Sequence, residues 1–328
     1  MRIEKFTNLY RDVTKEGTKI PQEKYCLTGQ FPIVDQGQRV IAGWWNDDAG
    51  IFKNVPAIIF GDHTRAIKYM EQPFFIGADG VKILRPTNIK DNPKYLYYAL
   101  QAAIIPNLGY SRHFKVVKEL QICIYSRDEQ NEIVRVLEKI DYLIEQRHAE
   151  TTYLDQLVKS RFIELFGEPL SNQKGWQTMS IVEAAPIKSQ RGDLADEVWL
   201  LNLDAVEAQT GTVLFKHRVQ SGEINASTVY FTAESVLYSK LRPYLNKVVM
   251  PDEDGVATSE MIPMYPLADR LNRAYLCYWL RSDVFVRHIS EKVAGAKMPR
   301  VSMDYFRSLA IEMPPLELQE QFAAFVEQ

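Results

Sequence analysis

A helical pattern of apolar residues in the middle of the chain constrains the fold more than any other feature. Between Ser126 and Phe166, apolar residues recur every three or four positions, which places them on one face of an α-helix. Ser126 and Glu129 form a capping box at the start, and Gly167 and Pro169 are expected to end the helix. A helix of about 40 residues is about 60 Å long, more than a compact domain needs. Because it lies mid-chain, we interpret it as a spacer between two lobes.

The apolar stripe on this helix also predicts packing against a partner. An exposed apolar face of this length would be covered by another protein, by a second helix of the same chain or by a second copy of the chain. The residues assigned to partner packing are Ile133, Val136, Leu137, Ile140, Leu143, Ile144, Leu154, Leu157, Val158, Phe322 and Phe325.

Length and composition predict a globular protein of about two domains. The chain has 328 residues, of which 46% are hydrophobic and 25% charged, and these values exclude disordered and fibrous classes. No apolar run approaches the roughly 18 residues of a membrane span, and the first residues lack a signal-peptide core. We therefore expect a cytoplasmic protein without membrane contact. The three cysteines lie far apart, which predicts buried, reduced thiols rather than a disulfide or a zinc site.

Each lobe is expected to mix strands and helices. In the first lobe, apolar runs bounded by proline, glycine and turn residues predict strands at 57–60, 81–84 and 120–124 and a helix at 94–103. The second lobe repeats this order, with strands at 198–203, 236–239, 261–264 and 309–313 and a helix at 272–280.

Three matches in the same order indicate that the lobes are copies of one unit. Tyr95–Leu100 matches Tyr275–Leu280, 180 positions later, and the strand before each ends at a proline. Residues 126–130 fall on 315–319, 189 positions later. The alternative is that two unrelated α/β halves carry similar helices. Because the sequence stops at Gln328, the second long helix is expected to be cut after a few turns.

Basic residues beside glycine, proline and amide residues predict contacts to nucleic acid. Lysine and arginine suit phosphates, whereas amide side chains can read base edges. The net charge of −3 argues against indiscriminate coating of polyanions, but it allows local basic patches. For each cluster taken alone, a solvated surface loop is the alternative. The candidate DNA-binding residues are Gln36, His63, Thr64, Arg65, Lys68, Arg112, Lys115, Gln190, Arg191, Lys240, Arg242, Tyr244, Asn246, Lys247, Lys297 and Arg300.

The sequence lacks the motifs of amine methyltransferases, of ATP-driven motors and of metal-dependent enzymes. Met313–Leu316 has neither the polar first nor the aromatic last position of an amine methyltransferase motif, and it is explained better as a helix start. A GxxxxGK[ST] loop is missing, which argues against an ATP-driven motor. The acidic run 252–254 is interpreted as a solvated turn, and the five histidines lack HExxH spacing. We therefore assign no catalytic residue and no metal ligand.

Three groups of residues carry a resemblance to a known family. Pro314–Gln319, with the apolar residues after it, is similar to the start of a conserved helix. Ser239–Lys247 is similar to one type of recognition-domain segment, and Phe31–Gly37 with Phe60–Arg65 resembles another. Together these strings resemble the specificity subunits of type I restriction–modification systems. The chain departs from that pattern at Tyr125–Asp128, where two prolines are usual, and in its short second helix.

The resemblance implies a DNA-reading subunit without catalysis of its own. Each of two target-recognition domains would read one half of a split target in double-stranded DNA. The implied partners are modification subunits with adenine-N6 methyltransferase activity and a restriction subunit that acts as motor and nuclease. S-adenosylmethionine, ATP and magnesium would belong to those subunits, so no cofactor is expected in this chain.

We therefore expect a mixed α/β fold in which the long helix packs antiparallel with a second conserved helix. The expected parts are a first target-recognition domain at 1–125, the spacer helix at 126–168, a second target-recognition domain at 169–313 and the start of the second conserved helix at 314–328. Half-sites read from one side of the duplex would lie roughly 34–36 Å apart, one helical turn. The chief alternative is a coiled-coil scaffold with no DNA role, which salt-dependent DNA binding would exclude.

Overall fold

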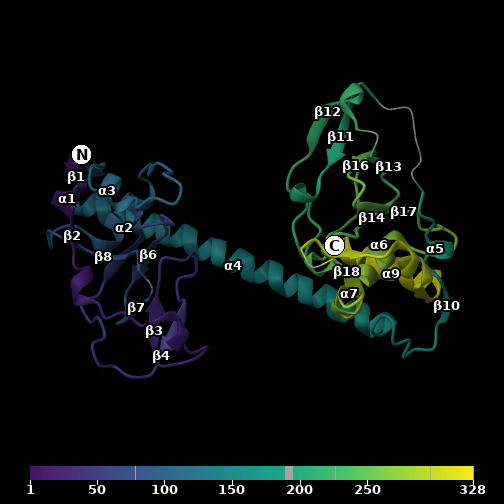
Figure 1. Cartoon of the computed structure of the whole chain (residues 1–328), viewed down its shortest axis with the longest axis horizontal. Coiled ribbons are helices and arrows are strands. Elements are labelled where there is room, and N and C mark those ends of the chain that lie inside the picture. The colour runs from purple at the N-terminus through teal and green to yellow at the C-terminus, as the bar shows by residue number, and fades with distance from the viewer. Residues whose placement is uncertain (78, 189–194, 226, 296, 328) are drawn as a thin grey trace. The chain divides into compact units, whose positions relative to one another are not determined.

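The computed structural model describes residues 1–77, 79–188, 195–225, 227–295 and 297–327 (Figure 1). The chain divides into two compact units, unit 1 at Met1–His148 and unit 2 at Ala149–Gln328. Both units combine short strands with helices, so the predicted mixed α/β fold class is confirmed. Among the described residues, none of the helices combines the length and the apolar character that a membrane span needs.

Unit 1 is built on an antiparallel four-stranded sheet in the order β2-β8-β5-β6. All five residues of β5 are buried, as expected for the apolar run Ala57–Phe60 at the centre of a sheet. The strands of this sheet are β2 (Tyr10–Asp12), β8 (Val81–Pro86), β5 (Ala57–Gly61) and β6 (Ile67–Met70). The remaining strands are β1 (Arg2–Lys5) paired with β9 (Gln121–Ile124), and β3 (Phe31–Val34) between β4 (Gly43–Trp45) and β7 (Phe75–Ile76).

Three short helices complete unit 1. Their bounds are α1 (Phe6–Leu9), α2 (Pro93–Gln101) and α3 (Phe114–Val117). Asn92 caps α2, because its side chain accepts the N–H groups of Lys94 and Tyr95. Apolar side chains of all three helices pack with β5 and β8 in one core.

Unit 2 contains two larger sheets. The first has four strands in the order β12 (His217–Gln220), β11 (Glu197–Leu201), β16 (Gly255–Ala257) and β13 (Val229–Phe231). The second has three strands in the order β15 (Val248–Val249), β14 (Val236–Ser239) and β17 (Met261–Met264). The two-stranded sheets are β10 (Gln177–Ser180) with β20 (Ala310–Met313) and β18 (Val293–Ala294) with β19 (Arg300–Val301). The helices are α5 (Ile181–Ala184), α6 (Arg273–Arg281), α7 (Asp283–Ser290), α8 (Met303–Ser308) and α9 (Leu316–Val326).

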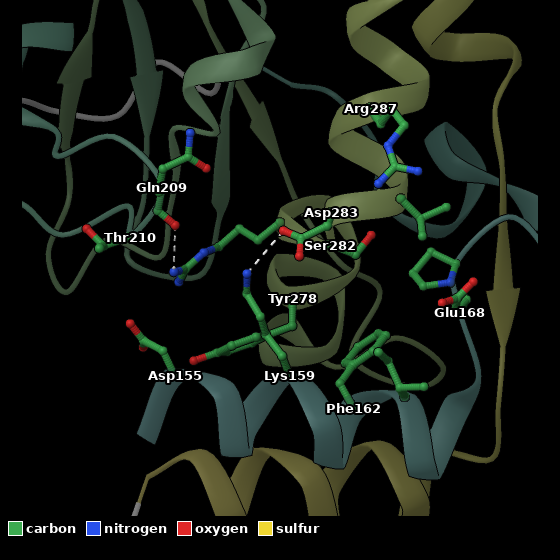
Figure 2. Close-up of a pocket in the computed structure, with 14 residues that line it drawn as sticks. Asp155, Lys159, Phe162, Glu168, Gln209, Thr210, Tyr278, Ser282, Asp283 and Arg287 are labelled. Atoms are coloured by element: carbon green, nitrogen blue, oxygen red, sulfur yellow. Dashed lines mark hydrogen bonds and ion pairs between the residues drawn. The ribbon is translucent and has the colours of Figure 1, made fainter. Parts of the chain in front are cut away.

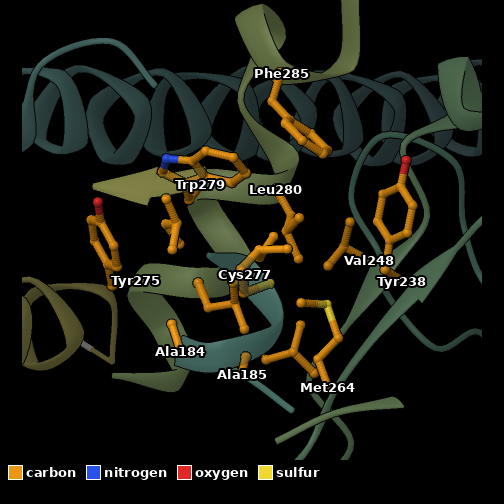
Figure 3. Close-up of a cluster of buried hydrophobic side chains, with 14 of the residues drawn as sticks. Ala184, Ala185, Tyr238, Val248, Met264, Tyr275, Cys277, Trp279, Leu280 and Phe285 are labelled. Atoms are coloured by element: carbon orange, nitrogen blue, oxygen red, sulfur yellow. The ribbon is translucent and has the colours of Figure 1, made fainter. Parts of the chain in front are cut away.

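The main core of unit 2 forms around α6. Tyr275, Trp279 and Leu280 project from this helix into a cluster that includes Phe285 of α7 and Tyr238 of β14 (Figure 3). Full burial of one such side chain contributes about 1.5–3 kcal/mol, so a helix with several of them is held mainly by its apolar face.

The long helix α4 spans Arg127–Phe166 and contributes residues to both units. The predicted capping box is present, since the Ser126 N–H donates to Glu129 Oε2 at 2.9 Å and the Glu129 N–H donates to Ser126 Oγ at 3.4 Å. At the other end Gly167 adopts a φ of +83°, and its N–H donates to Ile163 O at 2.8 Å. This left-handed conformation suits glycine, which explains why the helix ends there.

Matching contacts in the two units support the predicted duplication. The Tyr95 hydroxyl donates to Cys123 O at 2.6 Å, joining α2 to β9. In unit 2 the Tyr275 hydroxyl donates to Glu312 O at 2.9 Å, joining α6 to β20. The donors lie 180 positions apart and the acceptors 189, which are the offsets of the sequence repeat. The alternative of two unrelated halves does not explain these shared contacts.

Candidate nucleic-acid interface

In unit 1 a tight turn joins β5 to β6 and carries several of the predicted residues. Arg65 adopts a left-handed φ of +62°, and its N–H donates to Gly61 O at 2.8 Å. A Cβ at Gly61 would lie 2.9 Å from the carbonyl oxygen of Gln36, so the backbone segments approach more closely than a side chain would permit.

Buried polar contacts hold a second segment, the loop at 105–113, against this turn. The Asp62 carboxylate accepts the Phe114 N–H at 2.7 Å, and the Asp62 carbonyl accepts the His113 N–H at 2.8 Å. The Leu108 N–H donates to His113 Nε2 at 3.0 Å, so the ring proton lies on Nδ1, which donates to Asp62 O at 2.9 Å. Asp62 and His113 are both buried, and together they fix the position of the loop.

Three of the predicted unit 1 side chains stabilise this arrangement through internal hydrogen bonds. Gln36 donates to Asp79 O at 3.0 Å and accepts the His63 N–H at 3.2 Å. The Thr64 hydroxyl donates to Gln36 O. Arg65 Nη1 donates to Ile105 O at 3.0 Å. The base-reading role predicted for Gln36 would require its amide to exchange these partners for a base.

Lys68 is buried rather than displayed to solvent. Its side chain is 3% exposed, and Nζ donates to Asp35 O at 2.7 Å. Burial lowers the pKa of Lys68, and the nearby Asp35 carboxylate partly opposes that shift. In this structure Lys68 therefore stabilises the loop that contains Asp35.

The exposed part of this surface consists mainly of residues from the loop at 105–113 and its surroundings. Arg112 and Lys115, both predicted from sequence, are exposed, and His63 is half-buried with its Nδ1 3.2 Å from Tyr110 O. Tyr110 is fully exposed beside Arg112. An exposed aromatic ring two positions from an exposed arginine in the same loop is a stacking element suited to bases.

Sequence reasoning missed Tyr110 and Arg39 as candidates. Tyr110 lies between Gly109 and Ser111 in a turn-rich stretch, and this spacing is a signal that could have been used. Arg39 is exposed two residues after Gly37, in the segment that Lys68 and Thr64 contact.

In unit 2 the loop at 240–247 follows β14, as the turn at 62–66 follows β5 in unit 1. Two left-handed residues, Arg242 (φ +50°) and Asn246 (φ +49°), flank a 3₁₀ turn at Pro243–Leu245. Asn246 is buried, and its Nδ2 donates to Arg281 O at 3.0 Å. Tyr244 at the tip is 48% exposed. The loop is thus a compact structure held by its own turns.

The side chains of Lys247 and Lys240 are not freely solvated. Lys247 Nζ donates to Leu203 O at 2.6 Å, and burial lowers its pKa against the opposing influence of Asp204. Lys240 is half-buried, and its carbonyl accepts the Val301 N–H at 3.0 Å. This last contact joins the loop to the second predicted basic segment of unit 2.

The two predicted basic segments of unit 2 therefore lie side by side. The Arg242 N–H donates to Pro299 O at 2.8 Å. Arg300 binds the Glu260 carboxylate through Nη2 at 2.8 Å and Nε at 3.0 Å, which raises the pKa of its guanidinium. Lys297 is exposed. Unit 1 has the same arrangement, with the turn after β5 against the loop before α3.

The two remaining DNA-binding candidates, Gln190 and Arg191, lie outside the described residues.

The residues assigned to partner packing fall into three groups. Phe322 of α9 is fully buried, with its ring centroid 5.3 Å from that of Phe162 and 5.6 Å from that of Phe166, so α9 contacts the last part of α4. Ile133, Leu137, Val158 and Phe325 are partly buried. The other six, Val136, Ile140, Leu143, Ile144, Leu154 and Leu157, are each 46–56% exposed.

A pocket of about 430 Å³ lies in unit 2 between α4 and the start of α7 (Figure 2). Lys159 Nζ lies 3.0 Å from Asp283 Oδ1, and Arg281 Nη2 donates to Gln209 O at 3.2 Å. Lys159 and Asp283 thus pair across this pocket, and Arg281 is bonded to a backbone carbonyl. Elsewhere in the described part of the chain, no three histidine, cysteine, aspartate or glutamate side chains are grouped to hold a metal ion.

A family model matches most of the first unit and the start of the second. Residues 10–153 match the family model described as type I restriction modification DNA specificity domain. The type I restriction enzyme EcoDI specificity subunit of Escherichia coli is 25% identical over 156 residues, which cover 47% of this chain. The chain spans about a third of the length of that protein, since the match covers 34% of it.

A solved structure supports the fold over both units. The type I restriction–modification S subunit from M. genitalium matches with a TM-score of 0.60 and 14% identity, over 99% of this chain and 88% of that one. The resemblance suggested by the sequence motifs is therefore confirmed: residues 10–153 match the model of type I restriction modification DNA specificity domains, and a solved S subunit shares the fold.

Proposed function

We propose that this chain is the sequence-specific DNA-binding subunit of a type I restriction–modification complex. Each unit would read one half of a split target in double-stranded DNA. The observation that carries the proposal is the family match over residues 10–153, together with the same pair of adjoining basic segments in unit 2. A chain that reads two half-sites needs two such surfaces.

On the proposed DNA-contacting surfaces, exposed cations set the register and a few polar or aromatic groups read bases. Arg112, Lys115 and Lys297 are exposed, as phosphate contacts require. Tyr110 and Tyr244 offer rings at the tips of the loops. Gln36, Arg65, Lys68 and Lys247 contribute by holding the loops in shape, which lowers the ordering cost of binding.

The chain itself is proposed to have no catalytic role. Methyl transfer and cleavage, with S-adenosylmethionine, ATP and magnesium, would belong to modification and restriction subunits in the cytoplasm. Those subunits, or a second copy of this chain, would cover the exposed apolar residues of α4, because contiguous exposed apolar surface marks an interaction site.

Methylation-sensitive sequencing of the host genome, followed by binding assays, tests this function. The sequencing is expected to show one split adenine-methylated motif that depends on the gene for this chain. A labelled duplex with that motif should bind the purified chain, alone or with its modification subunits, with an affinity that falls steeply with salt. Loss of binding when either half is scrambled supports two reading units. Equal, weak binding to every duplex would instead support the scaffold alternative.

A further inference from the structure

A groove of about 420 Å³ on unit 1 is not explained by DNA recognition. It lies between β6, α2 and the first half of α4, and we call it the tyrosine–acid groove. Its ring and acid residues are Tyr69, Tyr97, Tyr98, Tyr142, Glu71, Glu138, Asp141 and Glu145.

Three tyrosine rings form one continuous wall of the groove. The ring centroids of Tyr69 and Tyr97 are 5.4 Å apart, and those of Tyr97 and Tyr98 are 5.0 Å apart. The faces of such rings carry negative partial charge and attract cations. Lys94 already uses this property, since its Nζ lies 5.3 Å from the centroid of Tyr69.

The acid side chains outnumber the cations that line the groove. Its four carboxylates face two ammonium groups, those of Lys68 and Lys94. Lys94 pairs with Glu138 at 2.8 Å and lies 3.8 Å from Glu71, and Lys68 is bonded to Asp35. Among the described residues, the carboxylates of Asp141 and Glu145 have no cation within salt-bridge distance, although the charge of Asp141 also helps to raise the pKa of Lys94.

The tyrosines are affected by this negative charge. Burial, with Glu71 and Glu138 nearby, raises the pKa of Tyr69 to about 12. Burial and the hydrogen bond that Asp141 accepts from the Tyr98 hydroxyl at 2.6 Å also raise the pKa of Tyr98. A site with this potential repels phosphates, so DNA is not its occupant.

The surroundings favour a protein segment over an inorganic ion. The described residues include no three-ligand group for a metal, because the carboxylates are spread along the groove. Ile140 and Ile144, next to Asp141 and Glu145 on α4, are 46% and 50% exposed. A peptide chain would cover these apolar side chains while placing a cationic side chain in the groove.

We propose that the tyrosine–acid groove binds an arginine side chain presented by a segment of a protein partner. The guanidinium stacks on the tyrosine wall and pairs with the carboxylates of Asp141 and Glu145, while the backbone of the segment lies over Ile140 and Ile144. Arginine fits better than lysine because its planar group stacks and pairs at the same time. Gln38, Val40 and Lys68 also line the groove, so it adjoins the segment that contains Asp35 and Arg39, whereas its four carboxylates lie after β6 and on α4.

A labelled peptide tests the site directly on the full chain. The probe is a fluorescein-labelled alanine–leucine peptide with one central arginine, compared by anisotropy with the same peptide containing neutral citrulline. The arginine peptide should bind about tenfold more tightly, because the cation–π and ion-pair contacts are both lost in citrulline. Glu145→Gln and Tyr142→Leu should each weaken it about threefold, since both side chains are exposed at the rim.

Glu132→Gln is the matched control, because Glu132 lies on the same helix and pairs with Arg135 outside the groove. It should leave peptide binding unchanged, and Glu145→Gln should leave binding to a target duplex unchanged. Equal binding of the arginine and citrulline peptides, or equal losses in Glu145→Gln and Glu132→Gln, would overturn the proposal. Spermidine binding that depends on Glu145 while the peptide fails to bind would also overturn it, in favour of a free polyamine.

Discussion

The side-chain oxygen of Gln319 accepts the backbone N–H of Asn272 at 2.8 Å, and this contact joins the start of α9 to the start of α6. Gln130 makes the same bond to the Asn92 N–H at 2.7 Å in unit 1. In each unit the asparagine then caps the following helix. In both units, therefore, a buried glutamine near the start of one helix (α4 or α9) binds the residue that caps another (α2 or α6).

Replacing Gln319 should destabilise unit 2. In Gln319→Ala, the Asn272 N–H loses its acceptor, and the carbonyls of Arg270 and Pro314 lose their donor. Gln319 is fully buried, so we expect a loss of about 1–3 kcal/mol in the free energy of unfolding. Urea denaturation followed by circular dichroism measures it. Glu320→Ala, at an exposed neighbouring position, is the control and should change little.

Asp62→Ala should release the loop at 105–113 from the β5–β6 turn. The Phe114 N–H then loses its carboxylate partner, while the fold of β5 is kept by its strand pairing. Loss of one such bond corresponds to about tenfold faster hydrogen exchange in the loop. Exchange mass spectrometry at peptide level checks this. Unchanged exchange at 105–113 would show that the contacts of His113 hold the loop in place without the Asp62 carboxylate.

Sequence patterns predicted the elements of this chain more securely than the roles of its polar side chains. The strand around Ile58 and the helix around Tyr95 follow from apolar runs and periodicity, and both were placed within two residues of their observed bounds. Lys68, in contrast, is an ordinary basic residue in sequence and a buried one in the structure. Its environment is set by Asp35, which lies 33 positions away and is brought close by tertiary folding that no local pattern encodes.

The same limit applies to the candidate interface. The predicted segments adjoin in each unit, as the bond between Arg242 and Pro299 shows. Their side chains, however, differ in exposure to solvent. Arg112 is exposed, whereas the amide of Gln36 is bonded within the fold. Tyr110 was missed because tyrosine in a short sequence window indicates core as readily as surface.

Arg112→Ala and Arg242→Ala should affect different half-sites. Arg112 belongs to unit 1 and Arg242 to unit 2, so each loss should appear with one half of the target and vanish when that half is already scrambled. A base contact is expected to cost about 1–3 kcal/mol, and a phosphate contact to lower the salt slope by about 1. Fluorescence anisotropy on duplexes with either half scrambled measures both. Lys139→Ala, at an exposed position on α4, is the control. Equal losses on every duplex would assign both arginines to phosphate contacts.

High pH should destabilise unit 1 through its buried tyrosines. Burial raises the pKa of Tyr95 to about 12, above the value of about 10 in an unfolded chain. The folded state favours the protonated Tyr95 hydroxyl, so this group contributes to the free energy of unfolding. The contribution is complete below about pH 10 and is lost as the pH rises through about 12. The melting temperature should therefore fall above about pH 10, together with a rise in tyrosinate absorbance. Tyr95→Phe should flatten that decline, whereas Tyr110→Phe, at a fully exposed ring, should not.

Leu143→Glu tests the exposed apolar face of α4. Leu143 is 52% exposed and belongs to neither main core, so the substitution should leave both units folded. A charge on this face should prevent its burial against modification subunits or a second copy of the chain. Size-exclusion chromatography with light scattering, on the chain alone and mixed with modification subunits, should show loss of the larger species. Lys139→Glu, on the same helix but outside the apolar stripe, controls for added negative charge. An unchanged mass in both samples would mean that the stripe around Leu143 is not the assembly surface.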